Sequence, residues 1–202
     1  YGELQALSTV GMQVLHESAV EPVRQRQIPL RIRSTLRPEL PGTRIASQSI
    51  PAASGAELVG FAGRRGISML RAEKGGLEQE PELLSAALSA LRQSGIPVFH
   101  SACSLGQLTV LTAPGAGADP LHAGTEALRR VLCSDQVKIR ENLSVLAALY
   151  RGPEAVSRLI SAVQSSGVPI HHMVSAGPCL LMAVNDSQYE AALRAAYAVR
   201  RN

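Results

Sequence analysis

The sequence predicts an α+β protein in which two βαββαβ units follow one another along most of the chain. The first observation is an internal repeat: with Gly95 set over Gly167, residues 84–111 align with residues 156–183 without a gap. The second is that each copy has a helix-period apolar pattern that stops at this glycine and is followed by two short strand patterns. Elements in this order form a four-stranded antiparallel sheet with two helices on one face.

The repeat is supported by identical residues in register, more than chance alignment gives. In each copy the helix ends in Ser-Gly, and a proline follows two residues later. The identical pairs are Ser85/Ser157, Ser89/Ser161, Ala90/Ala162, Ser94/Ser166, Gly95/Gly167, Pro97/Pro169, His100/His172 and Leu108/Leu180.

The first copy begins with a strand and a helix that has Leu84, Leu88 and Leu91 on one face. The Asp119-Pro120 pair predicts the cap and first turn of its second helix. Its expected strands are residues 67–72, 98–103, 107–112 and 136–141, with a turn at Leu105-Gly106, and its expected helices are residues 82–94 and 119–132.

The second copy runs out before a fourth strand, whereas residues 58–62 form a strand pattern with no place in the first copy. We therefore expect residues 58–62 to join the second unit's sheet, so that the two units interlock. A tight hairpin with residues 67–72, through Gly63 and Gly66, is the open alternative. The second copy's expected elements are residues 143–150, 153–166, 170–174, 179–185 and 187–200.

The first 56 residues differ in character. A helical pattern runs from Leu4 to Leu15, breaks near Glu17 and resumes, and residues 27–33 alternate like a half-buried strand. Small residues without periodicity then predict a linker. The expected domains are residues 1–45, the linker 46–56, a first unit at 57–141 and a second at 142–202.

Composition excludes several classes of protein. The 202 residues carry a net charge of +4 and are 46% hydrophobic, which is typical of an ordinary globular chain. Six aromatic residues are too few for a base-stacking surface, so no nucleic-acid partner is expected. No apolar run reaches membrane-spanning length, and three cysteines without C-x-x-C spacing favour the cytoplasm. Because residue 1 is Tyr1 and no leader follows it, we expect a piece of a longer chain.

The βαββαβ order is the ferredoxin-like arrangement. Two such units in tandem resemble the paired ACT domains that bind effectors in amino-acid metabolism. The N-terminal residues resemble the end of the aspartokinase kinase domain, whose pattern is roughly F-G-A-K-V-L-H-P, E-P-A, I-P-I-R-V, N-T-x-x-P and P-G-T. The matching segments are Leu7-Ser-Thr-Val-Gly-Met-Gln-Val-Leu-His16, Val20-Glu-Pro-Val23, Ile28-Pro-Leu-Arg-Ile32, Ser34-Thr-Leu-Arg-Pro38 and Pro41-Gly-Thr43.

The resemblance implies a full-length aspartate kinase that uses MgATP to make 4-phospho-L-aspartate, the first step towards lysine, threonine and methionine. This chain would contain the end of the kinase lobe, form a homodimer through the ACT domains and sense feedback effectors. Alone, it would not catalyse the reaction. The alternative is a non-catalytic ACT-type binding and oligomerisation module. Fusion to homoserine dehydrogenase or diaminopimelate decarboxylase, known in the family, stays open.

The family's residue roles map onto eight positions of this chain. The nucleotide-contacting Lys-Val corresponds to Gln13 and Val14, and glutamine lacks the ammonium charge that lysine offers to phosphates. Phe99 stands where relatives commonly have an acid for the effector's ammonium group. We therefore expect L-lysine or L-threonine to bind weakly or not at all. The expected effector-site residues are Glu82, Leu83, Leu84, Val98, Phe99 and Ser104.

Other candidate sites are weaker. His171 and His172 are adjacent on an expected strand and so point to opposite faces, which argues against a metal site shared with His100. Cys103 lies in no nucleophile pattern and is expected to be a buried thiol. Five arginines between residues 24 and 37 favour a solvated surface over support for a bound nucleotide.

Overall fold

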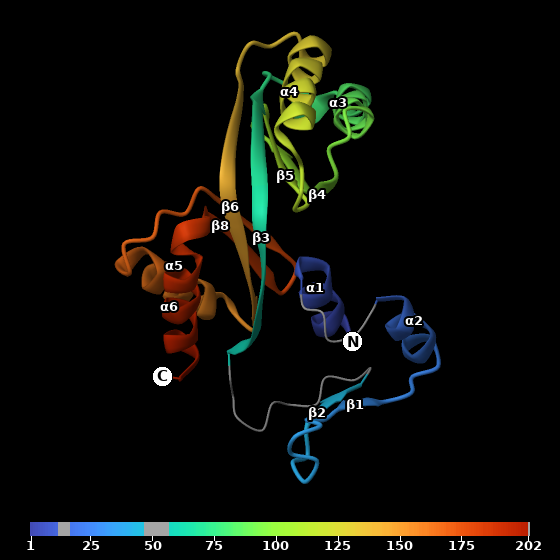
Figure 1. Ribbon diagram of the computed structural model, residues 1–202, viewed down its shortest axis with the longest axis vertical. Helices are drawn as coiled ribbons and strands as arrows, with labels where there is room; N and C mark the ends of the chain where they lie inside the picture. The colour runs from blue at the N-terminus through green and yellow to red at the C-terminus, as the bar shows by residue number, and fades with distance from the viewer. Residues whose placement is uncertain (12–16, 47–56, 202) are drawn as a thin grey trace. The chain divides into compact units, whose positions relative to one another are not determined.

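The computed structural model describes residues 1–11, 17–46 and 57–201 (Figure 1). They divide into two compact units. The first-copy unit comprises Arg64–Ser144 and Asn185–Ser187, and the second-copy unit comprises Tyr1–Gly63, Val145–Val184 and Gln188–Asn202. Each unit is described separately.

Two long strands, β3 and β6, run side by side and contribute to both units (Figure 1). The first-copy unit has the strand order β4-β5-β3-β6, and the second-copy unit has the order β3-β6-β8-β7. Both are the order that the βαββαβ prediction requires. The strands are β3 (Leu58–Glu73), β4 (Val98–Ser104), β5 (Gln107–Thr112), β6 (Val137–Tyr150), β7 (His172–Ala176) and β8 (Cys179–Asn185).

In the first-copy unit, α3 (Pro81–Gln93) and α4 (Ala118–Leu132) pack against each other and share one core with the sheet. The antiparallel register sets Leu70 opposite Val110, which places both side chains on the helix-covered face. A short 3₁₀ turn, η1 (Leu77–Gln79), leads into α3. The buried core consists of Leu70, Ala72, Leu77, Ala87, Leu91, Ile96, Leu108, Val110, Leu121, Leu128, Leu132 and Val137.

In the second-copy unit, α5 (Pro153–Ser165) and α6 (Tyr189–Arg201) form the equivalent helix pair. Leu58, at the start of β3, is 2% exposed and packs into this unit's core. Residues 58–62 therefore contribute to the second unit, as the sequence predicts. The buried core consists of Leu58, Leu146, Ala148, Ala155, Leu159, Val163, Val168, Leu180, Met182, Val184, Tyr189, Ala192 and Ala196.

The N-terminal elements form a small cluster of their own. Leu4, Val20 and Ile45 are its buried residues, and β1 pairs antiparallel with β2. Two contacts tie α1 to the rest of the second-copy unit: Arg151 bonds Glu3 at 2.8 Å, and Leu7 lies against Gly60. The elements are α1 (Gly2–Val10), α2 (Glu17–Gln25), β1 (Leu30–Ile32) and β2 (Thr43–Ile45).

The hairpin alternative is wrong, because residues 58–73 form one continuous strand. The separate strands expected at 136–141 and 143–150 are likewise a single strand, β6. Each long strand contains one residue with left-handed backbone, Gly66 (φ 68°) in β3 and Asn142 (φ 56°) in β6. Glycine and asparagine tolerate this conformation best, so the backbone changes direction locally without ending the strand.

Several boundaries also differ from the expectation. The strand expected at 170–174 lies two residues later, as β7 (His172–Ala176). Gly117, and not Asp119, is the cap residue of α4, which places Asp119 in the first turn. The strand expected at 27–33 is reduced to β1, since Gln27 has a left-handed φ of 56°. The closing helix begins at Tyr189 because residues 186–188 form a 3₁₀ turn, η2 (Asp186–Gln188). Among the described residues, no helix is both long and apolar enough to cross a bilayer.

Asp186, at the start of η2, is hydrogen-bonded to residues in the middle of β3 and β6 within the first-copy unit. Its carboxylate accepts hydrogen bonds from Arg65 Nε at 3.1 Å and from the hydroxyl of the fully buried Ser144. The Arg65 hydrogen bond, followed by that of Ser144, lowers the pKa of Asp186 from 3.8 to about 2. The folded chain therefore holds this carboxylate in its charged form.

We expect the hydrogen bonds of Asp186 to make the free energy of unfolding depend on pH in the acid range. Because the pKa of Asp186 is lower in the folded chain, its contribution is present above pH 3.8 and is lost as pH falls through about 2. The contribution is about 1–2 kcal/mol after allowing for solvent around the half-exposed Arg65. Urea unfolding of the wild type and of Asp186→Asn should show a constant difference near neutral pH that shrinks in strong acid. A difference that stays constant down to pH 2 would contradict the assignment.

Candidate functional site

The first turn of α3 is the part of the expected effector site that the fold defines best. Pro81 occupies the first helical position, where a missing N–H costs nothing. The amide of Leu84 donates to the carbonyl oxygen of Glu80 at 3.0 Å, so it is used within the helix. The helix entrance carries acidic side chains: Glu78, Glu80 and Glu82 are all exposed.

The side chains of Leu83 and Leu84 are part of the fold's interior packing. Both are partly buried and pack against the core of the first-copy unit. The α3 entrance therefore presents the carboxylates of Glu78, Glu80 and Glu82 to solvent, and not the leucine side chains. A carboxylate in the first turn is favourable for the helix, but it opposes binding of a second anion at the same place.

Ser104 ends β4 close to the α3 entrance. It pairs with Gln107 across a two-residue turn, and the turn is tied to η1 because Gly106 N–H donates to Glu78 Oε2 at 2.7 Å. Glu78 also acts on a nearby thiol: burial and then this carboxylate raise the pKa of Cys103. Cys103 is partly exposed and not buried as expected, and a neutral thiol beside a carboxylate is a poor nucleophile.

Val98 and Phe99 begin β4 and lie at the other end of the strand from Ser104. Six residue steps at about 3.3 Å each separate Val98 from Ser104 by about 20 Å. The guanidinium carbon of Arg64 lies 4.7 Å from the centroid of the Phe99 ring, a cation–π contact. Within one chain, the expected residues therefore form two groups, one at each end of β4.

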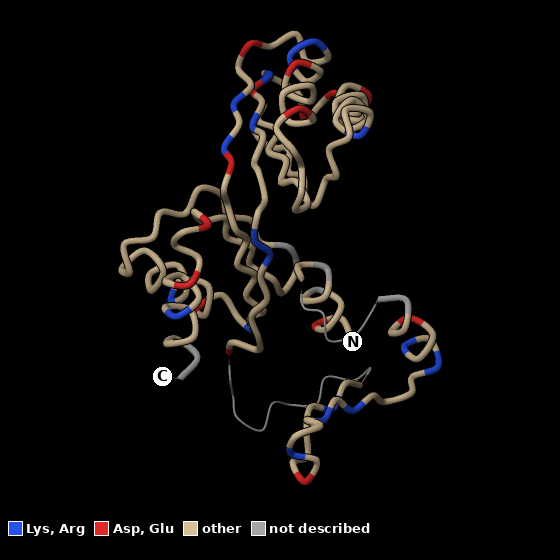
Figure 2. The backbone as a smooth tube through the Cα atoms, in the orientation of Figure 1, with Lys and Arg blue, Asp and Glu red and all other residues tan. Residues whose placement is uncertain are grey.

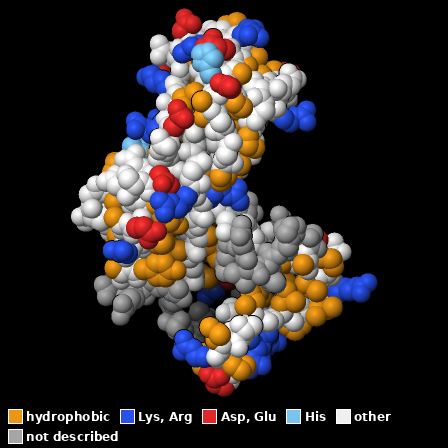
Figure 3. Space-filling view, in the orientation of Figure 1, with side chains coloured by type: hydrophobic (Ala, Val, Ile, Leu, Met, Phe, Trp, Pro, Cys, Tyr) orange, Lys and Arg blue, Asp and Glu red, His pale blue; other side chains and the backbone are white. Residues whose placement is uncertain are grey.

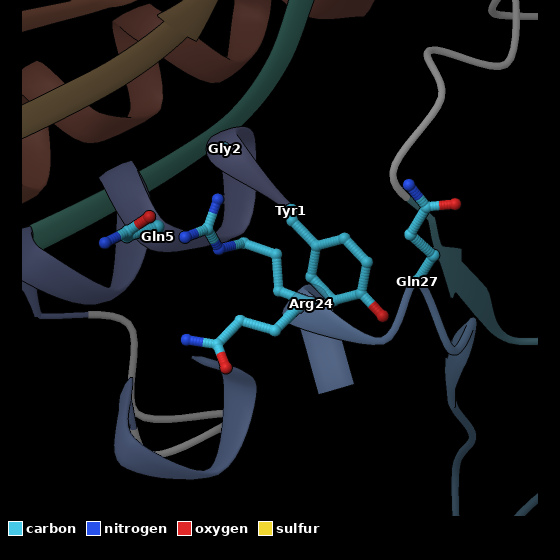
Figure 4. A pocket seen from close by; sticks show the side chains of 6 residues that line it. Tyr1, Gly2, Gln5, Arg24 and Gln27 are labelled. Carbon is cyan, nitrogen blue, oxygen red and sulfur yellow. The ribbon is translucent and has the colours of Figure 1, made fainter. Parts of the chain in front are cut away.

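Gln13 and Val14 lie outside the described residues. The described elements nearest to them in sequence, α1 and α2, line a hollow of about 310 Å³ (Figure 4). Its wall includes Tyr1, Gln5, Arg24 and Gln27. Arg24 bonds Glu21 at 2.7 Å, and this pair lowers the pKa of Glu21 and raises that of Arg24. The hollow is thus polar, and among the described residues of its wall the one cationic side chain, Arg24, is already paired with a carboxylate.

The remaining candidate groups are histidines and cysteines. Burial lowers the pKa of His100 and raises that of Cys179, which disfavours the charged form of each. Across residues 1–11, 17–46 and 57–201, no three His, Cys, Asp or Glu side chains gather as a metal site would require. Figure 2 shows Lys and Arg interspersed with Asp and Glu along β3 and β6 and around α3 and α4.

Two side chains at the site have no signal in the sequence. Arg64 reaches Phe99 from a different strand, and Glu78 reaches Gly106 over a separation of 28 residues. Both contacts depend on strand order, because β5 lies between β3 and β4. Local spacing carries no information about such pairs.

Comparison with known proteins gives relatives of one kind. No protein-family model matches the chain. Aspartokinase 3 of Bacillus subtilis is 24% identical over 209 aligned residues, which cover 98% of this chain and 44% of the relative. The chain thus spans less than half the length of this curated relative.

Solved structures show the same fold. Aspartate kinase from Clostridium acetobutylicum superposes with a TM-score of 0.83 at 22% identity, covering 99% of this chain and 47% of that one. The regulatory subunit of aspartate kinase from Thermus flavus gives a TM-score of 0.58 at 19% identity, covering 71% and 98%.

E. coli aspartokinase III, crystallised with lysine and aspartate in its T-state, gives a TM-score of 0.71 at 18% identity, covering 99% of this chain and 45% of that one. The C. acetobutylicum and E. coli structures thus each cover 99% of this chain, and the T. flavus subunit covers 71% of it. The chain resembles, in sequence and in fold, the C-terminal region of the aspartokinases, with its two interlocked ACT-type units.

Proposed function

We propose that the chain is the regulatory portion of an aspartate kinase together with the last elements of its kinase lobe. The observation that carries this proposal is the similarity to Bacillus subtilis aspartokinase 3, which runs through 98% of the chain and includes the N-terminal elements as well as both ACT-type units. Phosphorylation of aspartate with MgATP, in the cytoplasm, is proposed for a longer protein, since the chain matches 44% of that relative.

The N-terminal elements support a place in a larger lobe. Among the described residues, the core that these elements share consists of Leu4, Val20 and Ile45, whereas Ile28, Leu36 and Leu40 are 46%, 91% and 44% exposed. Figure 3 shows hydrophobic side chains gathered over α2, β1 and β2. Apolar surface of this kind is typically covered by another part of a protein or by a partner.

We also propose a homodimer through the ACT-type units. The sheet ends in two edge strands, β4 and β7, whose outer backbone groups have no neighbouring strand in the described order. Such edges pair readily with a second chain, and closed two-fold pairs are the commonest homo-oligomers.

The proposed response to effectors is a weak one. E. coli aspartokinase III has been crystallised with lysine, and an amino acid of this kind needs donors for its carboxylate and an acceptor for its ammonium group. In this chain the carboxylate of Glu82 lies at the α3 entrance, and the Leu84 amide is already hydrogen-bonded within the helix. The guanidinium of Arg64 lies over the Phe99 ring, where the ligand's ammonium group would need an acceptor. Each group would therefore repel the end of the ligand that it is expected to receive, and within one chain the two groups lie about 20 Å apart, at opposite ends of β4.

Calorimetric titration with L-lysine and L-threonine tests this response. Loss of one charge-assisted hydrogen bond weakens binding by about ten- to a hundredfold, so we expect dissociation constants well above the micromolar range. Phe99→Asp together with Arg64→Ala restores an acceptor and removes the cation, and should strengthen binding. Phe99→Leu is the matched control. A low-micromolar constant that is abolished by changing Leu83 or Ser104 would contradict the proposal and restore ordinary feedback sensing.

The contact of Arg64 with Phe99 also favours the second candidate, a non-catalytic ACT-type module that acts through association alone. The two candidates predict different activities for the longer protein. A kinase requires an upstream phosphate- and aspartate-binding lobe, and measurable turnover of aspartate with MgATP in the full-length protein would rule out the second candidate.

A further inference from the structure

The ribbon formed by β1 and β2 carries two arginines opposite each other. In the antiparallel register Arg31 pairs with Arg44, so both side chains leave the same face of the ribbon. Both residues are exposed, and together with Pro29 and Leu30 they line a hollow of about 270 Å³. Figure 2 shows basic positions on both strands. Like charges directly opposite each other destabilise a strand pair, so this arrangement is unfavourable for the ribbon by itself.

The two arginines have no acidic partner in the part of the chain that the structure describes. Among those residues, neither Arg31 nor Arg44 forms an ion pair with a carboxylate, whereas Arg151, for example, bonds Glu3. The segments 12–16 and 47–56 contain no Asp or Glu that could supply a partner. Positive charge is therefore concentrated on this face of the ribbon without a counter-charge.

A third arginine on this face is already engaged. Arg33 follows Arg31 by two residues and so leaves the same face, and its Nε donates to the carbonyl oxygen of Leu40 at 3.4 Å. A Cβ on Gly42 would lie 3.0 Å from Arg33 Cγ, so the arginine stem runs along the ribbon beside this glycine. The hollow is therefore lined by the guanidinium groups of Arg31 and Arg44, without Arg33.

The opposite face of the ribbon serves the fold. Leu30, Ile32 and Ile45 pack there in the small core that includes Leu4 and Val20. The opposed arginines have no part in this core. Packing therefore gives no reason for two cations to face each other, and a ligand of opposite charge does.

We propose that Arg31 and Arg44 form a binding site for an oxyanion of the phosphate type. A guanidinium group offers parallel N–H donors that match a pair of phosphate oxygens. Cβ atoms of directly opposed residues lie about 5 Å apart, so both side chains reach one anion held between them. A dianion there is attracted by both cations and offsets their mutual repulsion. The site goes beyond the proposed function, since it depends neither on the kinase reaction nor on the effector response.

The pairing of these arginines arises only in the folded chain. The run of arginines between residues 24 and 37 favours a solvated surface, and Arg44 lies outside that run. The register of β1 with β2 brings it to Arg31. The ligand chemistry, a phosphoryl group with two negative charges, occurs both in free phosphate and at the end of a nucleoside diphosphate. The experiment therefore uses both anions.

Titration with inorganic phosphate, followed by two-dimensional NMR of the isotope-labelled chain, tests the site. With ionic strength held constant by sodium chloride, we expect the signals of β1 and β2 to shift along one saturable curve. In Arg44→Gln the dissociation constant should rise at least about tenfold, because charge-assisted hydrogen bonds are lost. Arg44→Lys keeps the charge without the parallel donors and should weaken binding less. Arg92→Gln, at an exposed arginine of α3, is the matched control and should leave the constant unchanged.

Thermal unfolding without phosphate separates a ligand site from a role in the fold. The midpoint of Arg44→Gln should stay level or rise, because the repulsion between the two arginines is removed. A midpoint that falls would show that the pair serves the fold, and would overturn the proposal.

A second titration with ADP identifies the source of the oxyanion. Binding of ADP that is equal to or weaker than that of phosphate supports a site for free phosphate, and tighter binding supports a site for a nucleotide. Shifts that do not saturate with either anion overturn the site. A constant that Arg44→Gln leaves unchanged overturns it as well, because the anion would then bind elsewhere on the chain.

Discussion

Gly63→Ala is expected to destabilise the chain by about 3 kcal/mol, although it adds a single methyl group. A Cβ at Gly63 would overlap the hydroxyl oxygen of Tyr189 and lie 2.6 Å from its Cζ. Tyr189 is 9% exposed and belongs to the second-copy core with Leu58 and Leu146, so its ring has to leave this core. Urea unfolding followed by circular dichroism measures the effect.

A double-mutant cycle identifies the cause. Tyr189→Ala removes the obstructing ring and should lower the free energy of unfolding by about 3 kcal/mol. Adding Gly63→Ala should then lower it little further, because the methyl group has space. Gly75→Ala is the matched control, since nothing lies within 4 Å of a Cβ there, and it should change stability by less than about 0.5 kcal/mol. Additive losses in the cycle would show that the ring is not the obstacle.

Asp186→Ala is expected to lower the free energy of unfolding by about 2 kcal/mol near neutral pH. The hydroxyl of Ser144 is fully buried and donates to this carboxylate, so its removal leaves a buried donor unsatisfied. Arg65, whose side chain is 53% exposed, regains water and adds little to the loss. Chemical denaturation of both proteins at one pH measures the difference.

The controls for Asp186 separate the buried hydroxyl from the surface pair. Ser144→Ala should cost less than Asp186→Ala, because the carboxylate keeps Arg65 and no buried donor is stranded. Asp135→Ala, at an exposed carboxylate in the same unit, should be nearly neutral. Equal losses for Asp186→Ala and Asp135→Ala would contradict the assigned role.

Much of the fold could be predicted from the repeat, because its signals are local. The glycines that end α3 and α5, Gly95 and Gly167, have φ values of 78° and 75°, as helix-terminating residues require. The bounds of β5 and β8 agree with their apolar patterns. The alternative of a hairpin after Ala62 is wrong because Leu58 and Leu70 belong to different cores, and burial in both outweighs the turn preference of the intervening glycines.

The site was less predictable than the fold. Sequence similarity to a family aligns positions such as Phe99 and Ser104, but it says nothing of whether one chain brings them together. The rise along β4 sets them at opposite ends of the strand, and Arg64 reaches Phe99 from a strand that is not β4's neighbour. Such contacts arise from strand order, which only the folded chain supplies.

The sharing of β3 and β6 limits how this region can be inherited. A crossover or deletion between residues 141 and 142, the point where the repeat alone would divide the chain, would cut β6 and leave both sheets incomplete. The same holds for β3 beside Gly63, because residues on either side complete different cores. Recombination that keeps the fold intact therefore has to transfer both copies together, as one module.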